Sequence, residues 1–201
     1  MSVVVAIKKN DVIYMGADSQ ATRGGTRSTL SNPNNYKIWP VLDVDNCLMG
    51  CVGSLRANNI IKVSTDLIPE IVDLKDSLDF RFVVRSFVPA LMRELDLYDA
   101  MSKDKDTCPD MNASFILAYR DRLYVIDSYG SVIEVDDFCA IGSGASEALG
   151  SLLSSTEIKD PIDRITMAIK ASASHDIYVD YPIVISNTDD TEFRVYYEKD
   201  L

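Results

Sequence analysis

The chain has 201 residues, of which 47% are hydrophobic, and it carries a formal net charge of −11 at pH 7. This length suits one domain with a sizeable core, so we expect a single domain over residues 1–201. The acidic balance argues against nucleic acid or an anionic membrane as a partner, because both bind basic surfaces. No apolar run reaches the roughly 18 residues of a membrane span and no secretory signal is visible, so we expect a cytoplasmic protein.

The first quarter of the chain reads as strands. Two runs rich in β-branched residues, 3–7 and 12–15, are separated by Asn10-Asp11, a pair that favours a tight hairpin turn. Residues 19–35 are polar and contain Gly24-Gly25 and Asn32-Pro33, which predicts a loop. Two further strands are predicted over 36–44 and 47–52.

Helices and strands then alternate in blocks. Apolar spacing predicts one helix after Ser54 and a second from about Ser77, kinked at Pro89, followed by a charged loop over 99–112. Strands return from residue 113 to 142, separated by turn signals at 120–121 and 129–130. Helices are predicted over 144–154 and 161–174, and the last strands over 182–187 and 193–199.

This order of strands, two helices, strands, two helices and strands is not that of alternating βαβ units. Two antiparallel sheets packed together, with a pair of helices outside each, satisfy the pattern. The predicted fold class is therefore α+β.

The four cysteines do not form a metal-binding pattern. Cys47 and Cys51 are four residues apart in an apolar stretch, with no second close pair, and the single histidine, His175, is distant in sequence. A structural zinc site needs such a second cluster. We therefore interpret all four cysteines, including Cys108 and Cys139, as buried thiols, and expect no metal and no cofactor.

The start of the chain has the chemistry of a nucleophile. A serine hydroxyl is weak unless a base lies beside it. If Met1 is removed, Ser2 carries its own base, because a free α-amino group has a pKa near ~7.7–8.0. If Met1 is retained, the same nitrogen is an amide and cannot accept a proton. Met before Ser is a pair that cells ordinarily trim, so we expect removal.

Three residues supply what such a terminus needs, although each has a simpler interpretation. A two-residue turn at Asn10-Asp11 puts Asp18 opposite Val3, and a turn longer by one residue puts it opposite Ser2. Asp18 can instead cap a turn. Lys37, a cation that would lower the pKa of the amine, can be a solvated strand lysine. Gly53, whose N–H at a strand-to-helix junction suits an oxyanion, can be a turn glycine.

Taken together, these segments resemble a known family. The opening "SVVVAIKKNDVIYMGADSQAT" resembles proteasome β-type subunits and bacterial HslV-type peptidases, which are N-terminal-nucleophile (Ntn) hydrolases. The resemblance continues through four further segments in family order: "NYKIWPV", "LMGCVGSLRANN", "CAIGSGASEA" and "ASASHDIYVDY". No single motif is specific, but their order and spacing cover nearly the whole chain.

The resemblance implies a four-layer αββα sandwich and a set of site residues. The implied catalytic residues are the nucleophile Ser2 with Asp18, Lys37, Ser143 and Asp176, and Gly53 is the implied oxyanion donor. The implied substrate pocket includes Ser19, Gln20, Ala21 and Cys51. The implied partners are a peptide or unfolded-protein substrate, further copies of the chain in a homo-oligomeric ring, and an ATPase unfoldase.

Two positions depart from the family pattern. Serine replaces the commoner threonine at position 2 and lacks the methyl group that restricts the side-chain rotamer. Val179 stands where proteasome subunits usually carry a serine, three residues after the implied catalytic aspartate, as is also the case in HslV-type chains.

Three functions remain open at this point. The first is a peptidase of the threonine-protease family with an N-terminal serine. The second is a non-catalytic ring or scaffold subunit with the same fold, although the chain lacks the N-terminal helical extension of α-type subunits. The third is a small-molecule amidase of the same superfamily.

Overall fold

A computed structural model describes residues 2–65, 67–68, 78–103 and 107–200. Its two main sheets have five strands each, and all neighbouring strands are antiparallel. The first sheet has the order β10 (Phe138–Gly142), β1 (Val3–Lys9), β2 (Val12–Ala17), β11 (Ile183–Asn187) and β12 (Arg194–Tyr196). The second has the order β5 (Ile38–Pro40), β6 (Cys47–Gly53), β7 (Ala113–Tyr119), β8 (Arg122–Ile126) and β9 (Val132–Val135).

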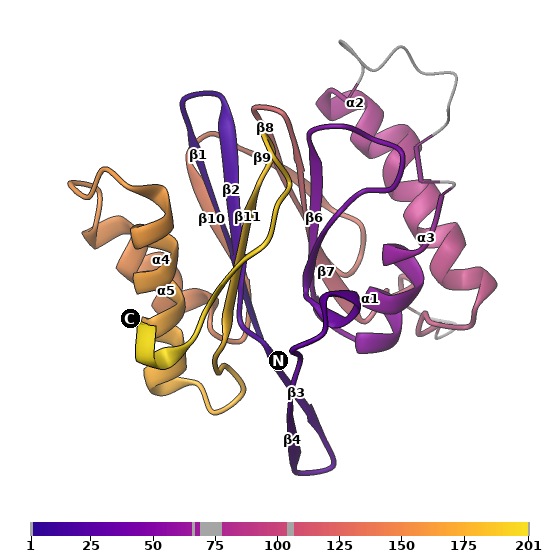
Figure 1. Cartoon of the computed structure of the whole chain (residues 1–201). Helices are drawn as coiled ribbons and strands as arrows, with labels where there is room; N and C mark the ends of the chain where they lie inside the picture. The colour runs from indigo at the N-terminus through magenta and orange to yellow at the C-terminus, as the bar shows by residue number, and fades with distance from the viewer. Residues whose placement is uncertain (1, 66, 69–77, 104–106, 201) are drawn as a thin grey trace.

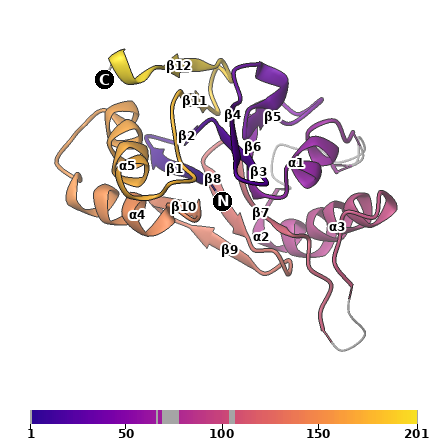
Figure 2. The same ribbon diagram turned by 90° about the horizontal axis from the view of Figure 1, so that it is seen from below.

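The helices cover the outer faces of the two sheets. Figures 1 and 2 show α4 (Ala145–Ser154) and α5 (Pro161–His175) on one side of the sheets, and α1 (Leu55–Lys62) and α3 (Val88–Leu97) on the other. The remaining helical segments are short: α2 (Phe80–Phe82), a π-helical turn (Val83–Phe87) and the 3₁₀ turns Pro33–Asn35 and Glu198–Asp200. The αββα sandwich expected from the sequence is confirmed.

Three apolar clusters separate the four layers. One lies between the two sheets and includes Val4, Met15 and Ile116. The second lies under α4 and α5, and the third lies between the second sheet and the helices α1 and α3. Residues 3–6 of β1 are fully buried because this strand has an apolar cluster on each of its faces. A strand covered on both sides reads as a continuous hydrophobic run, which explains the opening of the sequence.

Local capping sets the ends of the best-predicted helices. The Ser54 hydroxyl accepts a hydrogen bond from Ala57 N (3.3 Å) at the start of α1. The Asp160 carboxylate accepts one from Ile162 N (2.8 Å) at the start of α5, where Pro161 occupies the first turn. Such caps satisfy amides that have no partner inside the helix. Among the described residues, no helix is both long and apolar enough to cross a bilayer.

Several predicted boundaries are wrong. Residues 19–35 are not simply a loop, because they contain a hairpin of β3 (Gln20–Arg23) and β4 (Thr26–Thr29). The strand predicted over 36–44 is limited to Ile38–Pro40. The predicted start of the second helix at Ser77 lies outside the described residues, and α2 begins after its cap Asp79.

The second helix also changes its hydrogen-bonding pattern before Pro89. Val88 N donates to Val83 O, five residues earlier, within the π-helical turn. Proline has no N–H to donate to the preceding turn, so one hydrogen bond of the regular α-helical pattern is missing at this point. The predicted irregularity at Pro89 is thus a π-helical turn that precedes it.

Candidate active site

The first hairpin brings Asp18 to the start of the chain. Asn10 and Asp11 both have positive φ (51° and 63°), as a two-residue type I′ turn requires, and β1 and β2 pair Val4 with Ala17. Asp18 is therefore opposite Val3, the shorter-turn register expected from the sequence. Its Oδ1 accepts a hydrogen bond from Val3 N and its Oδ2 accepts one from Gln20 N, both at 2.9 Å.

Lys37 connects this carboxylate to Ser2. The lysine immediately precedes β5, and its carbonyl accepts a hydrogen bond from Cys51 N (2.8 Å) of β6. Its Nζ donates to Ser2 Oγ at 2.7 Å and to Asp18 Oδ1 at 2.7 Å. Ser2, Asp18 and Lys37 are 5%, 1% and 5% exposed, so this is a buried hydrogen-bonded triad and not a solvated strand lysine.

Burial shifts the proton affinities of both charged partners. It lowers the pKa of Lys37, against the opposing charges and hydrogen bond of its neighbours, chiefly Asp18. It raises the pKa of Asp18, against Lys37 and the N–H groups of Val3 and Gln20. Desolvation disfavours the charged form of each group. Lys37 therefore reaches its neutral, proton-accepting form at lower pH than an exposed lysine does.

The loop after β10 holds the backbone of Ser2 from the other side. Ser2 N donates to Ser143 Oγ at 3.0 Å, and Gly144 N donates to Ser2 O at 3.3 Å. Gly142 has a φ of +104°, and a Cβ atom on it would lie 2.1 Å from Ser2 O. Only glycine permits this close approach.

We expect Gly142→Ala to lower the free energy of unfolding by about 2 kcal/mol or more, because the substitution adds both backbone strain and a clash with Ser2 O. Denaturant unfolding measures this loss. The matched control is Gly150→Ala in α4, where a Cβ atom meets nothing within 4 Å. That variant should be neutral or slightly stabilised, since alanine is the better helix former. Equal stability of the two variants would contradict the proposed constraint.

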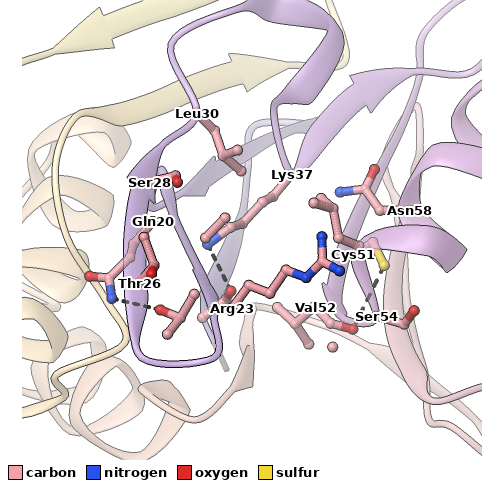
Figure 3. A pocket seen from close by; sticks show the side chains of 15 residues that line it. Gln20, Arg23, Thr26, Ser28, Leu30, Lys37, Cys51, Val52, Ser54 and Asn58 are labelled. Carbon is pink, nitrogen blue, oxygen red and sulfur yellow. Dashed lines mark hydrogen bonds between the residues drawn. The ribbon is translucent and has the colours of Figure 1, made fainter.

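A cavity of about 700 Å³ opens beside the triad (Figure 3). Fifteen residues line it: Ser2, Gln20, Ala21, Thr22, Arg23, Thr26, Ser28, Leu30, Lys37, Cys51, Val52, Gly53, Ser54, Leu55 and Asn58. They come from the start of the chain, the β3–β4 hairpin and its exit, the residue before β5, the end of β6 and α1. Gly53 has a φ of +102° at the β6–α1 junction, where a Cβ atom would lie 2.5 Å from Asn112 O.

Two of the expected site residues, Asp176 and Ser19, have positions that differ from the expectation. The Asp176 carboxylate caps the turn after α5, with Oδ1 accepting from Tyr178 N (2.9 Å), and it acts on Lys37 electrostatically. Its Oδ2 is buried without a hydrogen-bond partner in the described part of the chain. Ser19 is 1% exposed and does not line the cavity, whereas Gln20, Ala21 and Cys51 do.

The cysteines are free thiols, and one of them corrects the expectation that all are buried. Cys47, Cys51 and Cys139 are buried, but Cys108 is exposed. The apolar residues next to Cys47, Cys51 and Cys139 in the sequence predict burial for these three, whereas Cys108 lies in a polar loop between charged residues. Burial raises the pKa of Cys51 to about 12, so this thiol is a wall of the cavity and not a second nucleophile.

Sequence reasoning missed the contribution of the β3–β4 hairpin to the cavity. Thr22, Arg23, Thr26 and Ser28 all come from it. The sequence signal for this hairpin was the Gly24-Gly25 pair, which favours a hairpin turn. Both glycines adopt positive φ in the structure. Asn58 was also missed, because a polar residue on an amphipathic helix is ordinarily expected to face solvent.

Comparison with known proteins identifies the same fold. The family described as "Proteasome subunit" matches residues 108–186. A structure of Thiobacillus denitrificans BPH in complex with epoxomicin is similar with a TM-score of 0.73 and 18% identity, over 92% of this chain and 97% of that one.

Two further structures extend the comparison. Eukaryotic HslV from Trypanosoma brucei has a TM-score of 0.62 and 19% identity, over 92% of this chain and 98% of that one. Anbu (ancestral beta-subunit) from Yersinia bercovieri has a TM-score of 0.71 and 14% identity, over 98% and 87%. The resemblance of the chain to the proteasome β-type, HslV-like family of N-terminal-nucleophile hydrolases is therefore confirmed, and its fold is theirs.

Proposed function

We propose that the chain, as one domain over residues 1–201, is a peptide hydrolase with Ser2 as its N-terminal nucleophile once Met1 is removed. One observation carries the proposal: Lys37 Nζ lies 2.7 Å from Ser2 Oγ and 2.7 Å from Asp18 Oδ1 in a buried triad at the edge of a cavity. A nucleophile, a base within hydrogen-bonding distance and a group that orients the base are the parts that acyl transfer needs. Met1 itself lies outside the described residues.

The proposed reaction begins with attack of Ser2 Oγ on the carbonyl carbon of a peptide bond. The hydroxyl proton passes to neutral Lys37 Nζ, which is the base in direct contact with Oγ. The carbonyl oxygen becomes an oxyanion that the Gly53 N–H stabilises. The C–N bond then breaks, the amine leaves with a proton, and water hydrolyses the resulting ester to regenerate Ser2.

The α-amine has a second role in this scheme. After Met1 removal, the nitrogen that lies 3.0 Å from Ser143 Oγ is a free amine with a pKa in the working range. It can return a proton to the leaving amine and activate the hydrolytic water. Ser143 holds this amine by a hydrogen bond, and the negative charge of Asp176 supports the positive charge that Lys37 acquires in the attack.

Intact mass and peptide hydrolysis on the purified native protein together test this function. The expected result is a mass that lacks Met1 and turnover of unstructured peptides. Preferential turnover of simple amides would favour the amidase of the same superfamily. Retention of Met1 with no turnover of either class would contradict the proposal and favour the non-catalytic scaffold subunit.

We also propose that the chain assembles into a homo-oligomeric ring that acts with an ATPase unfoldase in the cytoplasm. The resemblance supports this, and so do apolar side chains left exposed on α4 and α5: Leu149, Leu153 and Met167. Light scattering at micromolar concentration should give a mass several times the 22.3 kDa of one chain. A compact monomer would contradict the ring.

A further inference from the structure

The charges around the cavity have one sign. Although the chain carries 31 acidic residues against 20 basic ones, none of the fifteen lining residues is acidic, and two are basic, Arg23 and Lys37. Lys37 is paired with Asp18 below the cavity. Arg23 is therefore the cavity's uncompensated charge among the residues described.

Arg23 is placed to meet a ligand. It is exposed, and no ion pair or hydrogen bond to its guanidinium occurs in the described part of the chain. Figure 3 shows its side chain extending from the hairpin across the cavity toward the wall that carries Cys51 and Asn58. A guanidinium presents several donors in a planar fork that matches a carboxylate.

Asn58 provides a second, independent observation. It is 3% exposed, it lines the cavity, and its Oδ1 is buried without a hydrogen-bond partner among the described residues. A buried carbonyl oxygen without a hydrogen-bond partner is costly, and it is ordinarily explained by a ligand or water that completes its bonds. Oδ1 can only accept a hydrogen bond, so the group of Asn58 that can donate to an acceptor in the cavity is the Nδ2 amide group of the same side chain.

We propose that this cavity receives the side chain of the substrate residue that precedes the cleaved bond, and that it selects an acidic side chain, aspartate or glutamate. The carboxylate would bind the Arg23 guanidinium and the Asn58 amide, with hydroxyls of Thr22 and Ser28 nearby on the hairpin. A basic side chain would meet the Arg23 cation, and an aliphatic one would leave the Arg23 guanidinium without a partner. This inference rests on the proposed peptidase function.

Specificity constants test the proposal with three fluorogenic peptides that differ only in carrying Glu, Leu or Arg before the reporter group. The native protein should prefer Glu over Leu by roughly 10- to 100-fold, as expected for hydrogen bonds between charged groups. Arg23→Ala should abolish this preference, and Arg23→Glu should favour the Arg peptide. Arg27→Ala is the matched control, because Arg27 lies on the same hairpin but pairs with Asp180 outside the cavity.

A second measurement separates this inference from the proposed function. Isothermal titration with acetylated tripeptide amides ending in Glu, Leu or Arg measures binding without turnover. If no peptide is cleaved but the Glu peptide binds most tightly and loses that advantage in Arg23→Ala, the peptidase proposal fails and the acidic pocket stands. Cleavage or binding that favours Leu or Arg, or that is unchanged in Arg23→Ala, overturns the acidic pocket. Absence of both cleavage and binding for all three peptides also overturns it.

Discussion

Ser2→Ala should abolish labelling by an electrophilic peptide probe and should lower peptide turnover by about 10³-fold or more. The reason is geometric: Ser2 Oγ is the group that receives the Lys37 hydrogen bond at the edge of the cavity, and the alanine variant keeps everything else. Intact mass after incubation with the probe measures the labelling. Circular dichroism and the assembled mass should match the parent protein, because Ser2 contributes little apolar surface to the core.

Ser2→Thr is the matched control for this experiment. Threonine keeps the hydroxyl group and adds a methyl group that restricts its rotamer, so this variant should retain labelling and turnover. The nucleophile assignment is wrong if Ser2→Ala is labelled as fast as the parent. Loss of labelling in both variants would instead show that the site tolerates no change at position 2, and intact mass would then be needed to establish whether Met1 is still removed.

The sequence predicted much of the framework because that part depends on local chemistry. The Asn10-Asp11 turn fixed the register that places Asp18 at Val3, and the β-branched runs before and after it gave the strands. The same reasoning placed Pro161 at the start of α5. Each of these features is decided by a few neighbouring residues.

The remainder of the site depends on contacts that no local pattern encodes. Lys37 could be read either as a solvated strand residue or as a partner of Ser2, and only the packing of the two sheets against each other buries it. Arg23 and Asn58 are 35 residues apart in the chain. They line one cavity because the β3–β4 hairpin and α1 both border it. The close approach of Gly142 to Ser2 O likewise appears only once β1 and β10 are paired.

Val179, three residues after Asp176, belongs to the core and not to the site. It is 3% exposed and packs with Ile183 and Ala148 in the apolar cluster under α4 and α5. The methyl groups of Val179 therefore serve packing at a position where a serine would offer a hydroxyl. Asp176 Oδ2 has no hydrogen-bond partner in the described part of the chain, and Asp176 acts on Lys37 through its charge.

Replacing Lys37 tests the base directly. In the parent protein, burial lowers the pKa of Lys37, so activity should rise with pH at lower values than an exposed lysine would give. Lys37→Ala leaves the amine as the remaining base of the proposed site and removes the positive charge beside it. Loss of a neighbouring positive charge raises the pKa of an amine. The rising limb of the pH–rate profile should therefore move to higher pH, and the rate should fall on the order of 10²-fold or more.

Lys37→Arg is the matched control, because it keeps a positive charge beside Asp18 but cannot give up a proton in the working range. If Lys37 acts as the base, the arginine variant should stay nearly as slow as the alanine variant. If Lys37 serves only through its charge, to keep the α-amine neutral, the arginine variant should recover part of the activity with a profile close to the parent's. Parent-like rates and an unshifted profile in Lys37→Ala would contradict both roles, since a group 2.7 Å from Ser2 Oγ and 5% exposed cannot be removed from a working triad without effect.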